Sequence, residues 1–372
     1  MQLINDNVTF NPPEDKSITK TINRTLKTAK LIDAFWERWI VHGLEIKDLS
    51  EIRNHLNTVE DWYASWESLA LKKIKMAIEL EADGKHPKAE YVYRQAALYY
   101  NINFWLNPKK TEQKQNWYRL CLYYTSIADS LSRYKTIYKK LTVNNSFICS
   151  GRVRIPTNPK GCIVIINPID STKEELFKYE MDFVEAGYIT LSFDGPGQGE
   201  TFINNSVIGT RQKWEQMINH VIDYAYEEFK GLPINLFGTS LGGSWVLYGS
   251  SHKNVSKAVA VSPAGNLEDL NMPSYFMDRM YCSCIVDDMD TRAMPKLNGA
   301  DCKAPIIIFH GCKDLMVTTN VMHQLFDSIN SEKQLIKYEN EGHVCNNKLD
   351  EIRKLSLSWY DGSYEMMGSS IL

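Results

Sequence analysis

One short run of the chain contains the residue types that a nucleophilic reaction requires. Residues 234–242 read Ile-Asn-Leu-Phe-Gly-Thr-Ser-Leu-Gly, which places Ser240 in a G-x-S-x-G pattern between a strand-like and a helix-like segment. Glycines at these positions permit a turn that is too tight for larger side chains and that exposes the serine hydroxyl. The amide of Leu241 begins the next helix and points to where an oxyanion would form. We therefore predict that Ser240 is a nucleophile and that Leu241 is an oxyanion-hole donor.

A nucleophilic serine needs a base and an orienting acid, and both follow it in the expected order. Asp314 comes after the strand-like run 306–310, and His343 comes after the run 334–339. Because parallel strands end at a common edge, the three side chains can converge there. His343 would take the serine proton, and Asp314 would fix the imidazole tautomer. The rivals His310, which we interpret as structural, and Asp301, which precedes its strand, fit these roles less well.

The second oxyanion donor is expected in the loop at residues 167–172. Pro168 has no amide hydrogen, so Ile169 is the first candidate and Asp170 the second. An ordinary strand–helix turn, with Ser171 or Thr172 as the N-cap, is compatible with that role. The glycine-rich run 194–200 lacks both the Lys-Ser/Thr end of a P-loop and the G-x-G-x-x-G spacing. We interpret that run as a turn at the rim of the site, and we expect no nucleotide cofactor.

The elements that would position these residues begin near residue 139. Strand-like and helix-like stretches alternate from there, which predicts an α/β fold with a largely parallel sheet covered on both faces. The expected strands are 139–143, 147–155, 162–167, 190–194, 234–238, 258–262, 306–310 and 334–339, and the expected helices are 173–186, 211–229, 241–252, 319–330 and 348–359. The alternation lapses at about 265–303, which we interpret as a cap insertion. Its Tyr275, Phe276 and Tyr281, together with Asp170, are candidate substrate-binding residues, although plain packing within the cap is the alternative.

The first third of the chain has a different sequence pattern. Between residues 17 and 140 apolar and aromatic side chains recur at helical spacing, which predicts an all-helical domain at 1–138 before the α/β core at 139–372. The aromatic residues are interpreted as helix–helix core, and some of them could line a ligand cavity at the domain boundary. An apolar helix face could also form a homodimer contact.

Composition excludes several classes of protein. The 372 residues carry 42 Lys and Arg against 45 Asp and Glu, a formal net charge of -3, which argues against a nucleic-acid or anionic-membrane partner. The aliphatic runs are strand-sized, and the start shows no secretory pattern, so we expect a cytoplasmic protein. The eight cysteines form no C-x-x-C pair and are expected to be reduced. No metal is expected, because no cluster has ligand spacing and the acidic run 287–290 is expected to face solvent.

The motifs resemble the α/β-hydrolase superfamily. The resemblance is carried by Gly238-Thr-Ser-Leu-Gly-Gly, by Asp314 in His-Gly-Cys-Lys-Asp, and by His343. Three further stretches, Ile169-Asp-Ser-Thr-Lys-Glu-Glu, Phe193-Asp-Gly-Pro-Gly-Gln-Gly-Glu and Arg94-Gln-Ala-Ala-Leu-Tyr-Tyr, narrow it to one group. That group contains fermentation-respiration-switch-like esterases, the 2,6-dihydroxypseudooxynicotine hydrolase and polyketide-chain-shortening hydrolases, including one of bacterial anthraquinone biosynthesis. The resemblance runs from about residue 60 onward and is weakest in 1–40 and 265–303. Its members often have Gly-Gly or Pro-Gly in place of Asn167-Pro168, which leaves the second oxyanion donor open.

Several members of that group break carbon–carbon bonds beside a carbonyl. The resemblance implies that Ser240 adds to a ketone and expels a stabilised carbanion from a bulky aromatic or poly-β-ketone substrate, either free or bound to an acyl carrier protein. A carboxylesterase with the same three residues is the alternative, because both reactions begin with attack on a carbonyl. A ligand-binding protein without chemistry is a further alternative, but such proteins usually lose one of the three residues.

Overall fold

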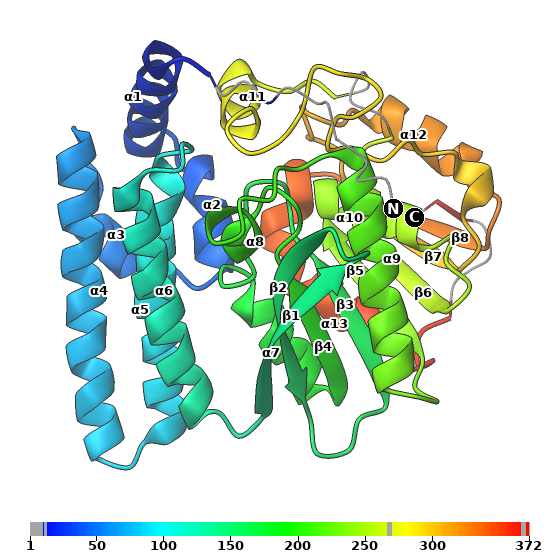
Figure 1. The fold of residues 1–372 in the computed structure, drawn as a ribbon, viewed down its shortest axis with the longest axis horizontal. Helices are drawn as coiled ribbons and strands as arrows, with labels where there is room; N and C mark the ends of the chain where they lie inside the picture. The colour runs from blue at the N-terminus through cyan, green and yellow to red at the C-terminus, as the bar shows by residue number, and fades with distance from the viewer. Residues whose placement is uncertain (1–9, 11–12, 266–269, 366–369, 372) are drawn as a thin grey trace.

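A layer of helices and a layer built around a β-sheet lie side by side in Figure 1. The structure is a computed structural model that describes residues 10, 13–265, 270–365 and 370–371, with the side chains of 274, 275, 370 and 371 left undescribed. Among these residues no helix is both long enough and apolar enough to cross a bilayer.

The helical layer is formed by residues 15–131. Local signals fix its helices: a capping box of Thr58 and Asp61 starts α4, Pro87 stands in the first turn of α5, and the Thr111 side chain caps α6. Helix α5 lies between α4 and α6, and most of its side chains are buried. The elements are α1 (Asp15–Leu31), α2 (Ala34–Val41), α3 (Ile46–Ile52), the 3-10 helix η1 (Arg53–His55), α4 (Val59–Ala82), α5 (His86–Leu106) and α6 (Glu112–Leu131).

Aromatic side chains make up much of the core of this layer. The Trp36 ring stacks on Trp62 with centroids 5.7 Å apart, and Trp39 meets Trp105 edge-on at 5.6 Å. The two layers share this core, since Phe177 and Phe202 of the second layer belong to the same buried cluster. The aromatic spacing of the first third is therefore explained mainly by packing.

The second layer contains a sheet of nine strands in the described residues, in the order β1-β2-β4-β3-β5-β6-β7-β8-β9. Strands β1, β2 and β4 pair antiparallel, and the pairs from β4 through β3 to β9 are parallel. The strands are β1 (Lys135–Val143), β2 (Phe147–Ile155), β3 (Gly161–Ile166), β4 (Tyr188–Phe193), β5 (Ile234–Thr239), β6 (Val255–Val261), β7 (Ile306–Gly311), β8 (Lys333–Tyr338) and β9 (Ser370–Ile371). The predicted α/β class with a mostly parallel sheet is confirmed.

Helices cover both faces of this sheet. Ile163 and Ile165 of β3 pack with α7 and α13, while Val164 and Ile166 face the opposite cluster with α9 and α10. This alternation explains why the strand is apolar throughout: both of its faces are buried. The helices are α7 (Phe177–Glu185), α8 (Gly199–Ile203), α9 (Arg211–Glu228), α10 (Leu241–Gly249), α12 (Thr319–Ser328) and α13 (Leu349–Tyr360).

The chain between β6 and β7 is long and mostly irregular. Its described part contains α11 (Ser274–Met280) and the 3-10 helix η3 (Gly299–Asp301), and it lies at the top of Figure 1, where α11 contacts α1. This is the segment in which the strand–helix alternation of the sequence lapses, and it reaches from the sheet to the helical layer.

A buried ionic network joins the two layers. Arg152 and Arg154 of β2 both bind Glu180 of α7, with N–O distances of 2.7 Å, and all three side chains are fully buried. Asp129 of α6 completes the network with Arg154 at 2.7 Å and with Arg94 of α5 at 2.8 Å. Charges removed from water need such partners, so the network fixes how the helices sit against the sheet.

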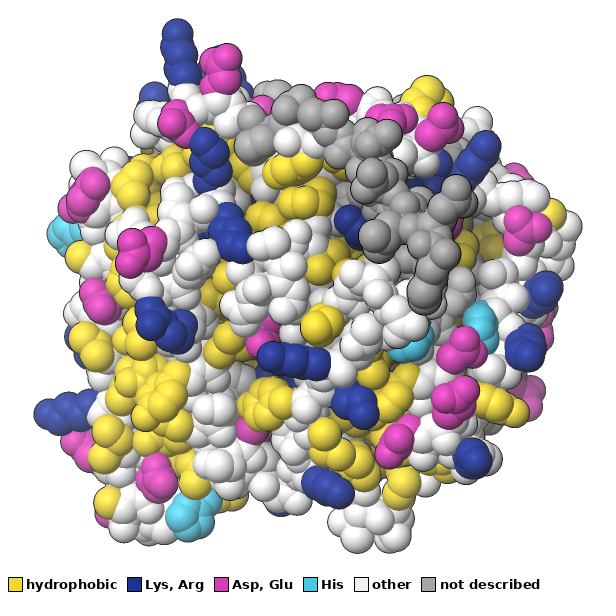
Figure 2. Space-filling model, in the orientation of Figure 1, with side chains coloured by type: hydrophobic (Ala, Val, Ile, Leu, Met, Phe, Trp, Pro, Cys, Tyr) yellow, Lys and Arg dark blue, Asp and Glu magenta, His cyan; other side chains and the backbone are white. Residues whose placement is uncertain are grey.

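The outer surface mixes both signs of charge. Figure 2 shows Lys and Arg side chains interspersed with Asp and Glu, and hydrophobic side chains gathered at lower left, over α4 to α6.

Candidate active site

Ser240 stands at a sharp turn between β5 and α10. Its backbone has φ 54 and ψ -124, a conformation that L-residues rarely adopt. A Cβ at Gly238 would collide with the carbonyl of Gly242, and a Cβ at Gly242 would collide with the carbonyl of Ile166. The amide of Ser240 donates to Val261 O at 2.8 Å, which ties the turn to β6. The glycines are therefore required by close backbone approach, as the motif predicts.

Three side chains form a continuous hydrogen-bonded chain at this turn. His343 Nε2 lies 2.8 Å from Ser240 Oγ, and His343 Nδ1 lies 2.7 Å from Asp314 Oδ2. With Nδ1–H donating to the carboxylate, Nε2 is left to accept the serine proton. The structure thus brings together the three residues that the sequence analysis selected, from three separate strand ends.

Asp314 is held in its ionised form. Its side chain is fully buried, and Oδ1 accepts hydrogen bonds from the amides of Met316 at 2.8 Å and Val317 at 3.0 Å. Burial by itself would raise the pKa of Asp314, but the His343 contact and the two amides lower it below its ordinary value. A fixed negative charge at this position favours protonation of His343 during a reaction.

Neither rival residue belongs to this hydrogen-bonded chain, although His310 lies close enough to Asp314 and His343 to feel their charges. His310 is buried in β7, with Nε2 3.3 Å from Thr319 Oγ1, and burial lowers its pKa to about 4. A histidine that stays neutral at ordinary pH fits a structural role. Asp301 is exposed in η3, away from this group.

Three candidate amides are available to an oxyanion. Within the described residues, the N–H groups of Leu241, Ile169 and Asp170 donate to no protein acceptor, so the hydrogen bonds leave both loop candidates open. Gln198 Nε2 donates to the carbonyls of Pro168 at 2.6 Å and Ile169 at 3.1 Å, so those oxygens are held toward Gln198. The neighbouring glycine-rich run is an internal turn, because the Asp194 carboxylate accepts from the amides of Lys173 and Glu200 at 2.9 Å each.

A cavity of about 520 Å³ lies over Ser240. Its walls come from α1, α2 and α5 of the helical layer, from the segment between β6 and β7, and from the strand ends of the sheet. This volume is within the usual range of about 300–1,000 Å³ for pockets that bind drug-sized organic molecules. The lining is mainly apolar, with the aromatic side chains Phe35, Trp39, Trp105, Tyr179 and Phe276 and the methionines Met272, Met280, Met294 and Met316.

Of the four predicted substrate-binding residues, some line the cavity over Ser240 and others do not. Asp170 and Phe276 line the cavity. Tyr281 does not line it, and its hydroxyl instead contacts Asp287 on the same segment. The side chain of Tyr275 lies outside the described residues, although its backbone belongs to α11.

Arg38 of α2 and His42, the residue that follows α2, also line the cavity, and the sequence pattern predicted neither of them. Arg38 binds Glu175 and Asp170, and His42 Nδ1 lies 2.8 Å from Glu175 Oε1. The only signal in the sequence was their position among helically spaced aromatic residues, and nothing in that pattern pointed to contacts more than 130 residues away.

No family model matches the chain, but several known proteins are similar to it. The chain is 24% identical over 326 residues to the 2,6-dihydropseudooxynicotine hydrolase of Paenarthrobacter nicotinovorans, a match covering 84% of this chain and 87% of that one. It is 25% identical over 277 residues to the hydrolase LUC6 of a Fusarium species, covering 68% and 63%, so it spans less than two thirds of that relative. The 20-hydroxy-prefusarin hydrolase FUS2 of Gibberella moniliformis is 24% identical over 253 residues, covering 62% and 59%.

Solved structures show the same architecture. The crystal structure of the 2,6-dihydroxy-pseudo-oxynicotine hydrolase superposes with a TM-score of 0.74 at 23% identity, over 87% of this chain and 94% of that one. AbyA5 superposes with a TM-score of 0.59 at 12% identity, over 93% and 94%. The chain therefore has the α/β-hydrolase fold, and its resemblance is to the group of α/β hydrolases that includes the 2,6-dihydropseudooxynicotine hydrolase.

Proposed function

We propose that this protein is a serine-dependent hydrolase that cleaves a carbon–carbon bond beside a carbonyl in a bulky aromatic or poly-β-ketone substrate. The observation that carries the proposal is the Ser240–His343–Asp314 chain, with distances of 2.8 and 2.7 Å, at the floor of a large apolar cavity. Unpartnered amides at Leu241 and Ile169 supply the donors that a tetrahedral oxyanion needs.

The reaction follows from the positions of these groups. His343 removes the hydroxyl proton while Ser240 Oγ adds to a ketone carbon, and the resulting oxyanion accepts hydrogen bonds from the two amides. Collapse of the oxyanion breaks the carbon–carbon bond, and the leaving enolate takes the proton that His343 holds. Water, activated in turn by His343, then hydrolyses the acyl-enzyme. The sum is a 1,3-diketone and water giving a carboxylic acid and a shorter ketone.

The cavity supports a substrate with an apolar, aromatic character. A carbanion leaves only when a second carbonyl or an electron-rich ring delocalises its charge, and flat conjugated molecules of this kind suit a wall of Phe35, Trp39 and Trp105. Relatives named for pseudooxynicotine and prefusarin hydrolysis support the same substrate class.

The test combines active-site labelling with product analysis. A fluorophosphonate probe is expected to modify wild-type protein at Ser240 and to leave Ser240→Ala unmodified. Incubation with an aryl 1,3-diketone is expected to release the shortened acid and ketone, detected by mass spectrometry, and Ser240→Ala again serves as the control.

Other outcomes would change the assignment. Turnover of acyl esters without any diketone cleavage would favour a carboxylesterase with the same three residues. Absence of an adduct on Ser240 in folded protein would contradict a serine mechanism and favour a ligand-binding role.

A further inference from the structure

The residue beside the Ile169 amide is held by three separate parts of the chain. Asp170 Oδ1 accepts from Arg38 Nη1 of α2 at 2.9 Å, and Oδ2 accepts from Trp105 Nε1 of α5 at 2.7 Å. Arg279 of α11 lies 3.5 Å from the same Oδ2. Both carboxylate oxygens of Asp170 are therefore occupied by protein donors, which argues for a structural use of this side chain rather than direct substrate binding.

Arg38 hydrogen-bonds to several residues of this loop in addition to Asp170. Its Nε and Nη2 donate to the two oxygens of Glu175 at 2.7 and 2.8 Å, and Nη2 also donates to Ser171 Oγ at 2.9 Å. The guanidinium lies 4.8 Å from the Trp39 ring centroid, which limits its movement. One side chain of the helical layer thus binds residues 170, 171 and 175, the segment that leads directly from Ile169 into α7.

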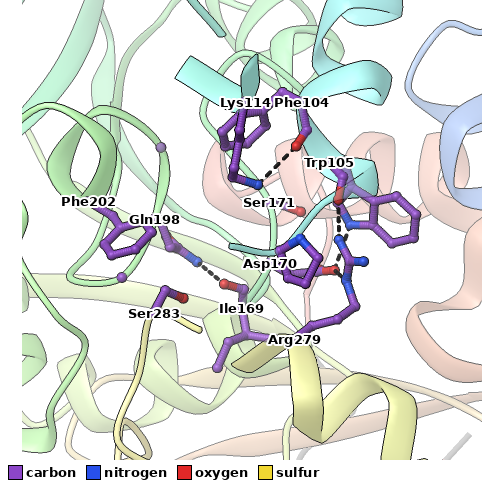
Figure 3. A pocket seen from close by; sticks show the side chains of 13 residues that line it. Phe104, Trp105, Lys114, Ile169, Asp170, Ser171, Gln198, Phe202, Arg279 and Ser283 are labelled. Carbon is purple, nitrogen blue, oxygen red and sulfur yellow. Dashed lines mark hydrogen bonds and ion pairs between the residues drawn. The ribbon is translucent and has the colours of Figure 1, made fainter. Parts of the chain in front are cut away.

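The opposite side of the loop is fixed as well. Figure 3 shows Gln198 directed at the carbonyl of Ile169 and Arg279 directed at the backbone of Trp105. Both side chains line a small cavity of about 40 Å³, which residues 169–171 of the loop also line. Carbonyls are thereby held on the Gln198 side and the carboxylate of Asp170 on the Arg38 side. The Ile169 amide remains without an acceptor in the described structure, on a loop that also lines the cavity over Ser240.

We propose that Arg38 is a positioning residue for the oxyanion hole: by binding Asp170, Ser171 and Glu175, it holds the Ile169 amide toward Ser240. The inference rests on the proposed function and makes the helical layer part of the reaction machinery rather than a cover for the cavity. Burial would raise the pKa of Glu175, but Arg38 and His42 lower it to about 2, so the bidentate pair stays ionised at ordinary pH.

The chain provides a matched control for Arg38. Arg53 is also in the helical layer, its side chain is 23% exposed against 22% for Arg38, and it pairs with Asp33 and with the carbonyl of Ala29. None of these described contacts reaches the sheet layer. Arg53→Gln therefore removes a comparable cation without touching the loop.

The experiment measures the rate constant for fluorophosphonate labelling of Ser240 in the full-length variants. Removing one oxyanion donor outright costs about 10²–10³-fold in rate, so mispositioning it through Arg38→Gln is expected to slow labelling roughly 10–100-fold. The pH at which the rate inflects should stay constant, because the His343–Asp314 pair is untouched. Arg38→Lys should recover only part of the rate, since an ammonium cannot bind Glu175 bidentately while reaching Asp170. Added guanidinium ion should partly restore Arg38→Ala.

Hydrogen exchange of residues 168–175 provides a readout that does not depend on chemistry. Faster exchange in this segment in Arg38→Gln and Arg38→Lys, but not in Arg53→Gln, supports the conclusion that Arg38 holds the loop. If wild-type protein also fails to label, the proposed function falls and the oxyanion role falls with it, whereas the loop contact stands. Unchanged exchange, or labelling within two-fold of wild type in folded Arg38→Gln, overturns the inference. Equal losses in Arg38→Gln and Arg53→Gln would overturn it too, because they would indicate a general effect on the helical layer.

Discussion

Replacing Glu180 with glutamine tests the buried network that joins the two layers. Two fully buried guanidinium groups depend on this carboxylate, with Arg152 bound at 2.7 and 2.8 Å and Arg154 at 2.7 Å. Removing one member of a buried pair leaves an uncompensated charge and costs about 3–5 kcal/mol. Glutamine keeps one acceptor oxygen, so we expect the lower end, about 3 kcal/mol, which is a large share of a typical stability of about 5–15 kcal/mol.

Urea unfolding followed by tryptophan fluorescence is a suitable assay. Six of the nine tryptophans belong to the helical layer: Trp36, Trp39, Trp62, Trp66, Trp105 and Trp117. With a slope of about 3 kcal/mol per M, a loss of about 3 kcal/mol moves the midpoint down by about 1 M. Glu185→Gln is the control, because Glu185 lies on the same helix and pairs only loosely with an exposed Arg133 at 3.5 Å.

The pH dependence of this difference can be derived from the charges. Burial by itself would raise the pKa of Glu180, but Arg152 and Arg154 lower it below 4.5. A carboxylate with a lowered folded-state pKa contributes stability above the unfolded value, and that contribution is lost as pH falls toward the folded value. The gap between wild type and Glu180→Gln should therefore be constant near neutrality and shrink below pH 4.5. A gap under about 1 kcal/mol at neutral pH would refute the reasoning, since it would mean that the arginines do not need this partner.

Three further outcomes are expected. Asp314→Asn should slow fluorophosphonate labelling by about 10⁴-fold, because His343 would lose the partner that fixes its tautomer, and a loss under tenfold would contradict that role. Gly242→Ala should lower the free energy of unfolding by about 1–3 kcal/mol in thermal melts, because its Cβ would meet the carbonyl of Ile166; an unchanged melting temperature would show that the turn can relax. Burial lowers the pKa of His310 to about 4, so the unfolded chain binds the extra proton between pH 6.5 and 4 and wild type should lose up to about 3 kcal/mol there relative to His310→Gln. Parallel stability curves for the two proteins would contradict the last expectation.

The regular part of the fold follows from local pattern. Continuous apolar runs such as 162–166 predict strands buried on both faces, and the observed β3 to β8 begin and end within about three residues of the expected positions. The predicted ends of helices and strands are wrong where contacts with distant residues override the local conformational preference. Helix α7 begins at Phe177 rather than at residue 173, because the Lys173 amide is bound to Asp194 and Thr172 to Asn101. Strand β1 begins at Lys135, earlier than expected, because residues 135–138 pair with β2.

Part of the candidate site could likewise be predicted from local sequence pattern, and part of it depends on distant contacts. Ser240, Asp314 and His343 could be selected from sequence because each follows a strand, and parallel strands end at one edge. Arg38 could not be selected, because an arginine on an amphipathic helix is normally expected to face solvent. Its contacts with residues 170–175 exist only in the folded protein. Tyr281 was chosen as a pocket residue because aromatic residues surround it in the sequence. That pattern does not determine the direction of its side chain, which contacts Asp287 on the same irregular segment.

The cavity over Ser240 has one further consequence. Its reacting groups all come from the ends of sheet strands, whereas much of its wall comes from residues 28–42 and from α11. Substitutions at the apolar wall positions of those segments, such as Phe35 and Phe276, would alter which molecules fit without changing the reacting groups, whereas Arg38 in the same stretch is proposed to support the reaction itself. We therefore expect selectivity to change through the apolar side chains of the wall while Ser240, Asp314 and His343 stay the same.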